Sequence, residues 1–230
     1  MSAPGGQDWV DYDAHARTRP RDDLWGQVRR TVRGQPVPTE QIDAIVAMVR
    51  RRLALEAGDV LLDLACGNGA LTARLQGFVG ASMGVDVSAY LIEVARERFA
   101  GEAHDFFEHD AAAFVETTVD AAAFTKALCY GSLSYMDDAT VRRMLRALHA
   151  RCPALERVLL GNLPDPARAG LFYAGALPDL RAHRSDIGVW RSAEDLAALA
   201  GPGWTLSVSV MPREFYAAHY RFDALLVRAA

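Results

Sequence analysis

Acidic side chains fall at three places in this sequence where a buried strand is expected to give way to a helix. Asp63 closes an apolar run, and Gly67 and Gly69 follow it at alternate positions, while Asp86 and Asp110 close the next two expected strands. Because the carboxyl ends of parallel strands meet at one edge of a sheet, these carboxylates are expected to lie together, where they can accept hydrogen bonds from a nucleoside ligand. Glycines without a Cβ let such a ligand approach the backbone. The pattern therefore predicts a cofactor site.

The order of these residues resembles the first motif of class I S-adenosylmethionine (SAM) dependent methyltransferases, in which an acid is followed at alternate positions by Gly or Ala, Gly and Gly. Here the motif reads Asp63, Ala65, Gly67 and Gly69, and the resemblance covers most of residues 55–163. It implies SAM as the cofactor and S-adenosylhomocysteine as the product. The cofactor-binding residues that it implies are Asp63, Ala65, Cys66, Gly67, Gly69, Asp86, Val87, Asp110, Ala111 and Leu128.

Each acid has a role in this interpretation. Asp63, placed before the turn, suits a cationic methionine amino group. Asp86 lies about twenty residues beyond the first turn, where an acid can accept hydrogen bonds from both ribose hydroxyls. The resemblance assigns the adenine amino group to Asp110. A strand-end Asp is often only a helix cap, but three such acids at successive strand-to-helix junctions favour a nucleoside pocket.

A dinucleotide site is the main rival for the glycine-rich turn. That fingerprint requires a third glycine where the helix meets the strand, and Thr72 occupies this place in the present sequence. A turn that binds no ligand is the remaining alternative. The acid ahead of the glycines favours SAM over NAD.

Candidates for the methyl-transfer step are His219, Tyr130 and His183. A hydroxyl acceptor requires a general base, and imidazole titrates near neutral pH, so His219 is the first candidate. The alternative is that His219 is a surface residue. His183 lies in a segment whose path the sequence does not define. Tyr130 or Tyr135 is placed to close over the cofactor, although packing beneath a loop is the alternative.

Length and charge restrict the classes of function. The 230 residues carry a net charge of −4, which gives no global reason to expect nucleic-acid binding and leaves a local basic patch open, and no apolar run reaches membrane-spanning length. The three cysteines lack metal-ligand spacing, so no metal site is expected. The N-terminus has no signal-peptide pattern, and abundant Ala and Arg are compatible with a bacterial source. We therefore expect a cytoplasmic protein that binds neither nucleic acid nor membrane.

The elements that position these residues alternate between strand and helix, which is typical of an α/β fold with a Rossmann-like, doubly wound sheet and helices on both faces. The resemblance implies the strand order 3-2-1-4-5-7-6 with the last strand antiparallel. Strands are predicted at residues 60–64, 81–86, 106–109, 121–128, 157–161, 204–210 and 220–228. Helices are predicted from Thr39 as N-cap, at 70–76, 89–99, 111–115 and 139–150, and after a capping box that begins at Ser192.

The chain is expected to form one domain over residues 1–230. Residues 1–38 form an expected N-terminal lid, in which Arg17, Arg19 and Arg21 could clamp a phosphate or carboxylate, with a solvated basic face as the alternative. Residues 162–190 form an insertion after the fifth strand.

Residues 187–190 and 219–223 resemble stretches in small-molecule methyltransferases of bacterial polysaccharide or secondary-metabolite pathways. This likeness implies methyl transfer to a small polar metabolite, with a hydroxyl, for example of a sugar, preferred over an amine. The alternatives are an N-methyltransferase of a small amine, an NAD-dependent oxidoreductase and a non-catalytic SAM-binding module. A homodimeric state stays open.

Overall fold

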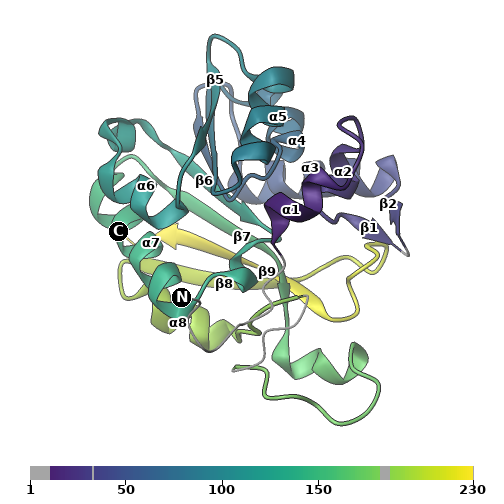
Figure 1. Cartoon of the computed structure of the whole chain (residues 1–230). Helices are drawn as coiled ribbons and strands as arrows, with labels where there is room; N and C mark the ends of the chain where they lie inside the picture. Colours follow the sequence, from purple (N-terminus) through teal and green to yellow (C-terminus); the bar gives the residue numbers. More distant parts are fainter. Residues whose placement is uncertain (1–10, 33, 182–186, 230) are drawn as a thin grey trace, which may run out of the picture.

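The computed structural model describes residues 11–32, 34–181 and 187–229. Its main feature is a seven-stranded sheet in the order β5-β4-β3-β6-β7-β9-β8, in which β9 runs antiparallel to β7 and β8 (Figure 1). The predicted fold class and strand order are therefore confirmed. The strands are β3 (Val60–Leu64), β4 (Ala81–Asp86), β5 (His104–Glu108), β6 (Lys126–Tyr130), β7 (Arg157–Pro164), β8 (Trp204–Val210) and β9 (Arg221–Arg228).

Helices cover both faces of this sheet because successive strand residues point to opposite sides. Leu62 and Leu64 join the core beneath α6, α7 and α8, whereas Leu61 joins the core beneath α3 and α4. Phe106 packs with α5 in a third cluster. The α-helices are α3 (Thr39–Leu53), α4 (Ala70–Leu75), α5 (Ala89–Phe99), α6 (Ala111–Thr117), α7 (Asp138–Arg151) and α8 (Ala193–Ala200). The 3₁₀-helices are η1 (Gln76–Phe78), η2 (Val119–Ala123), η3 (Leu133–Tyr135) and η4 (Pro166–Leu171).

The strands β5 and β6 differ from their predicted limits at both ends. β5 begins at His104, two residues before the predicted start, and ends at Glu108. The strand predicted from residue 121 begins only at Lys126, because the alanine-rich stretch before it forms η2. Leu128 consequently lies in the middle of β6 instead of at its end.

The predicted helix ends are correct at one place and wrong at another. Ser192 and Asp195 form the predicted capping box at the start of α8. Thr39 is not the N-cap of α3: Pro38 holds that position with φ −52°, and Thr39 is the first helical residue. The proline ring already fixes the backbone there, so the helix begins without a side-chain cap.

β7 extends past residue 161 into the predicted insertion. The register of its pairing with β9 shifts between Leu160 and Leu163, and Asn162, inside the shift, has a φ of +61°. The Asn162 backbone N–H donates to Asp223 Oδ1 of β9 at 2.7 Å. This bulge turns the end of β7 beside the carboxyl ends of the parallel strands.

The N-terminal segment lies against α5, on the side of the sheet that carries the glycine-rich turn (Figure 1). Asp13 accepts hydrogen bonds from Ser88 Oγ at 2.7 Å and from the Tyr90 N–H at 3.0 Å. Arg21 forms ion pairs with Glu93 at 2.9 Å and Glu97 at 2.5 Å. The segment comprises α1 (Tyr12–Arg17), α2 (Leu24–Gln27), β1 (Thr31–Val32) and β2 (Gln35–Pro36).

Candidate active site

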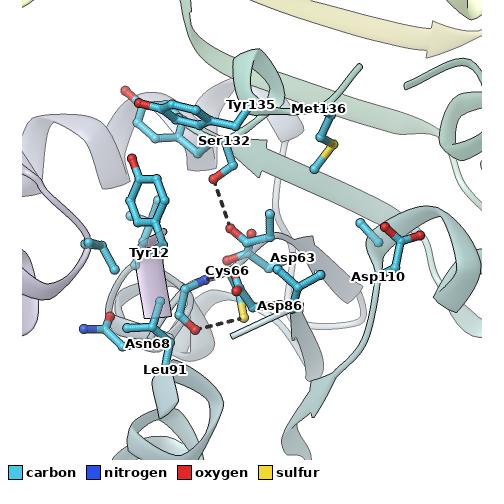
Figure 2. A pocket seen from close by; sticks show the side chains of 18 of the residues that line it. Tyr12, Asp63, Cys66, Asn68, Asp86, Leu91, Asp110, Ser132, Tyr135 and Met136 are labelled. Carbon is cyan, nitrogen blue, oxygen red and sulfur yellow. Dashed lines mark hydrogen bonds between the residues drawn. The ribbon is translucent and has the colours of Figure 1, made fainter. Parts of the chain in front are cut away.

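A cavity of about 420 Å³ lies at the carboxyl ends of the parallel strands and beneath the N-terminal segment (Figure 2). It brings together all but two of the residues predicted for the cofactor. The predicted residues that line it are Asp63, Ala65, Cys66, Gly67, Asp86, Val87, Asp110 and Ala111. Polar groups from several strand ends therefore face one enclosed space of ligand size.

Asp63 forms the deepest acidic group of this cavity and is only 2% exposed. Its carboxylate accepts a hydrogen bond from Thr72 Oγ1 at 2.6 Å. Burial raises the pKa of Asp63 to about 7, against the opposing effects of the Thr72 hydrogen bond and the Arg30 charge. A methionine amino group would supply the cation that this buried carboxylate lacks, so Asp63 fits the role that the sequence predicts.

Thr72 also bears on the dinucleotide alternative. It stands where the dinucleotide fingerprint has its third glycine, and its side chain is fully buried. Its hydroxyl donates a hydrogen bond to Asp63 and so fixes the orientation of that carboxylate. A pyrophosphate-binding turn would not require an oriented carboxylate at this position.

Asp86 organises the glycine-rich turn from the next strand. Its carboxylate accepts hydrogen bonds from the Gly67 N–H at 2.8 Å and the Ser88 N–H at 2.9 Å. Burial raises the pKa of Asp86, and these two hydrogen bonds oppose the rise. The remaining lone pairs of its carboxylate face the cavity and would accept ribose hydroxyls.

Gly67 requires its lack of a side chain for two reasons. Its φ is +59°, and a Cβ built on it would lie 2.8 Å from Val28 Cγ1 of the N-terminal segment. That segment therefore seals the turn from above. Gly69, with a φ of +72°, is the N-cap of α4 and does not line the cavity. Its absent Cβ leaves room for Phe106, whose Cε1 would be 2.7 Å away.

The remaining predicted cofactor residues divide between the wall and the core. Asp110 caps α6 by accepting a hydrogen bond from the Ala113 N–H at 2.8 Å, and it still lines the cavity. Figure 2 places it across the view from Tyr12. Leu128 is fully buried in the core beneath α3 and α4 and does not reach the cavity.

The cover of the cavity comes from two segments that are distant in sequence. The rings of Tyr12 and Tyr135 pack edge to face, with centroids 5.3 Å apart, above the strand ends (Figure 2). Ser132 Oγ donates to the Ala65 carbonyl at 3.2 Å, which holds the loop after β6 close to the turn after β3. The sequence predicted that Tyr135 could close over the cofactor, and the structure puts its ring in the cavity wall.

Tyr130 also lines the cavity, as a buried side chain whose hydroxyl has no hydrogen-bond partner among the described residues. Its ring fills the space that Gly161 leaves open, and the Arg30 guanidinium lies 5.0 Å from the ring centroid. Burial raises the pKa of the Tyr130 hydroxyl well above its usual value. The hydroxyl is therefore protonated at neutral pH and is a poor base.

A second cavity, of about 200 Å³, adjoins the first and shares part of its wall. The residues common to both are Tyr12, Val28, Arg30, Gly131 and Tyr135. The residues that line only the second are Arg29, Thr31, Asn162, Ile187, Tyr216, Tyr220 and Arg221. Two adjacent spaces therefore share part of their lining, one acidic and one rich in arginine and tyrosine.

The predicted general base does not lie in either cavity. His219 is exposed, and its ring packs edge to face on Tyr220 with centroids 4.7 Å apart. The sequence places it correctly beside β9, but the local chain directs it outward. His183 lies outside the described residues. The predicted clamp is also not assembled, because Arg17 pairs with Asp13 and Arg21 with the two glutamates of α5.

Several residues of the site were missed from the sequence. Arg30, which lies between the two cavities with a buried Nη1 that has no partner among the described residues, was one of many arginines in its segment. Asn162 carried a weak signal, because Asn tolerates the left-handed conformation that a bulge requires. Nothing in the local pattern connected Tyr216 with either of them.

Comparison with known proteins agrees with this geometry. A family described as "Methyltransferase domain" matches residues 61–152, from β3 to the end of α7. A curated relative, 27-O-demethylrifamycin SV methyltransferase of Amycolatopsis mediterranei, is 27% identical over 221 residues, which cover 84% of this chain and 78% of the relative.

Solved structures share the fold at lower identity. The N-methyltransferase NodS of Bradyrhizobium japonicum, in complex with S-adenosylhomocysteine, superposes with a TM-score of 0.67 at 16% identity and covers 98% of this chain and 100% of its own. Magnesium protoporphyrin IX methyltransferase of Synechocystis, with bound SAM, has a TM-score of 0.58 at 17% identity and covers 97% and 100%. These neighbours differ in their acceptors, so they define the fold and not the substrate.

Proposed function

We propose that this chain, which is a class I S-adenosylmethionine-dependent methyltransferase, transfers the methyl group to a hydroxyl group of a small polar metabolite. The single observation that carries the proposal is the pair of adjacent cavities, because one holds the acids suited to SAM and the other is a separate polar space for an acceptor. The curated relative, whose name describes methylation of an oxygen, supports the preference for a hydroxyl.

The residues of the larger cavity would hold the cofactor by complementary charge and hydrogen bonding. Asp63 would receive the methionine amino group, Asp86 the ribose hydroxyls and Asp110 the adenine amino group. Arg30, which lies near Asp63 and has an unpartnered Nη1 among the described residues, is the cation suited to the methionine carboxylate. When bound, SAM supplies an electrophilic methyl group that an acceptor oxygen attacks in line.

The residues of the chain would act mainly by positioning the acceptor and SAM and by excluding water from the two cavities. Tyr12 and Tyr135, whose rings pack edge to face, belong to the lining that both cavities share, and Tyr130 adds a buried ring to the larger one. None of the described residues common to both cavities is an imidazole. A hydroxyl that loses its proton easily, such as a phenol or enol, therefore fits better than an unactivated sugar hydroxyl.

An amine acceptor is the second candidate within the same chemistry. An amine needs no general base once it is neutral, because it attacks with its free lone pair. The lack of an imidazole among the described residues common to both cavities therefore suits an amine as well. A non-catalytic SAM-binding module would bind the cofactor in the same way but would show no transfer to any acceptor.

Two measurements test the proposal. Calorimetric titration should show binding of SAM and S-adenosylhomocysteine and none of NAD. Extract fractions incubated with the protein and methyl-labelled SAM should then yield a labelled product, whose methyl group is released by hot hydriodic acid under conditions that leave N-methyl groups attached. Cofactor binding without any labelled product would leave only the non-catalytic module.

A further inference from the structure

The smaller cavity contains a buried cation whose counter-ion the described part of the chain does not provide. Arg221 is 8% exposed, and it forms no ion pair with any carboxylate of the described residues. Its Nη1 donates to the Asn162 carbonyl, and its guanidinium lies 4.9 Å from the Tyr220 ring centroid. Buried charges in folded proteins are normally paired, so this guanidinium is suited to an anion from outside the chain.

The surroundings of Arg221 strengthen this requirement. Arg29 and Arg30 line the same cavity, and no acidic side chain is among its described lining residues. The nearest acid along β9 is Asp223, which accepts a hydrogen bond from the Asn162 N–H and whose pKa is raised to about 6 by burial. Its carboxylate is therefore engaged elsewhere.

The lining also indicates the shape of the bound molecule. The side chains of Tyr12, Tyr135, Tyr216 and Tyr220 provide aromatic surface with hydroxyl tips around about 200 Å³ of space. The Nε and Nη2 of Arg221 make no hydrogen bond to a described residue. These two N–H groups lie on one side of the planar guanidinium and can therefore bind both oxygens of a carboxylate. A carboxylate on a small ring matches both features.

We propose that the methyl acceptor is a small hydroxy acid whose carboxylate binds Arg221, while its hydroxyl points through the shared wall toward the larger cavity. This inference rests on the proposed function, since it assigns the smaller cavity to the acceptor. The carboxylate fixes the distance and direction of the reacting oxygen, so it acts in positioning. A phenolic acid fulfils the requirement for an acidic hydroxyl at the same time.

The first test is binding of benzoate to the protein saturated with S-adenosylhomocysteine, measured by calorimetry, with benzamide as the neutral analogue and inorganic phosphate as a competing anion. Wild-type protein should bind benzoate and not benzamide, and R221M should weaken benzoate at least tenfold. R221K, which keeps the charge and loses the fork, provides a second variant if R221M does not fold. R213M, at an exposed arginine in the connection before β9, is the matched control and should bind as wild type does.

Three outcomes separate the proposals. Failure of S-adenosylhomocysteine to bind would remove the proposed function itself. Binding of that ligand without binding of benzoate, or with equal benzoate affinity in R221M, would overturn the anion site and leave the methyltransferase assignment intact. Tight binding of phosphate without binding of benzoate would show that the site does not recognise a carboxylate, and would overturn the proposed hydroxy acid. The labelled product from extract fractions gives an independent check, since it should be retained on an anion-exchange resin at neutral pH.

Discussion

Asn68 donates its side-chain amide to Gln27 Oε1 at 2.9 Å, between two side chains that are almost completely buried. The same Nδ2 also donates to the Leu24 carbonyl at 2.8 Å. The turn that follows β3 and the N-terminal segment are therefore joined through one side chain. The cofactor cavity is complete only when both are in place.

Asn68→Ala should lower the free energy of unfolding by about 2–3 kcal/mol, because three side-chain hydrogen bonds are lost and buried polar groups are left unpaired. Urea denaturation measures this change. A double-mutant cycle with Gln27→Ala should give a coupling energy of about 0.5–3 kcal/mol, as expected for side chains in direct contact. Additive effects would show that the two side chains do not support each other.

The raised pKa of Asp63 gives stability and cofactor binding opposite dependences on pH. The pKa is about 7 in the folded protein, against 3.8 for an aspartate carboxyl in water, so the folded state binds more protons between these values. Stability without cofactor should therefore fall as pH rises from about 4 to 7. SAM affinity should rise over the upper part of this range, because its amino group requires the ionised carboxylate.

Urea denaturation and calorimetry at pH 5.5 and pH 8 test both trends. Asp63→Asn should flatten both curves and weaken SAM at the higher pH. Asp223, whose pKa is also raised, to about 6, contributes to stability in the same direction. Asp223→Asn is thus the matched control: it should reduce the slope of stability while the slope of SAM affinity remains.

Asp86→Ala should weaken SAM binding by roughly 1.5–3 kcal/mol, since the ribose hydroxyls lose a charged acceptor. It should also destabilise the protein without ligand, because the Gly67 and Ser88 N–H groups lose their acceptor. Calorimetry and thermal unfolding separate the two effects. Asp120→Ala, at an exposed carboxylate outside the cavity lining, is the control. Unchanged SAM affinity in Asp86→Ala would exclude this residue from the cofactor site.

Tyr130→Phe should leave turnover within about tenfold of the wild-type value and cost little stability, because the hydroxyl that it removes is buried and has no partner among the described residues. His219→Gln should retain most of the wild-type activity, since the imidazole is exposed and lines neither cavity. Steady-state kinetics on the true acceptor test both variants. A loss of about 10² or more in His219→Gln would restore it as the general base.

The meeting of the three acids in one cavity could be predicted from the sequence because they follow the strand ends one after another. Asp63, Asp86 and Asp110 each lie where an apolar run stops, and parallel pairing must bring such ends together. Leu128 shows the limit of this reasoning. Its strand was expected to end at residue 128, but it extends to residue 130, so Leu128 points into the core and Tyr130 takes the position at the edge.

The smaller cavity had only a short local signal, because the resemblance noted for residues 187–190 and 219–223 covers Ile187, Tyr220 and Arg221 of its lining. Arg30, Asn162 and Arg221 come from the N-terminal segment, the β7 bulge and the start of β9, and no periodicity relates such distant positions. The sequence also did not show whether the side chain of His219 points into the site or toward solvent. Its residue type suggested a base, but the connection before β9 decides which side chains turn inward, and here it buries Ala218 and Tyr220.

The N-terminal segment is attached to the rest of the protein by contacts that differ in their sensitivity to salt. Its outer contacts, from Arg21 to Glu93 and Glu97, are partly exposed ion pairs, whereas the inner contact of Asn68 is a buried neutral hydrogen bond. Salt screens the charges of the ion pairs and weakens them, whereas it has little effect on the buried hydrogen bond. Raising the ionic strength should therefore weaken the attachment of the segment to α5, while its attachment to the turn after β3 persists.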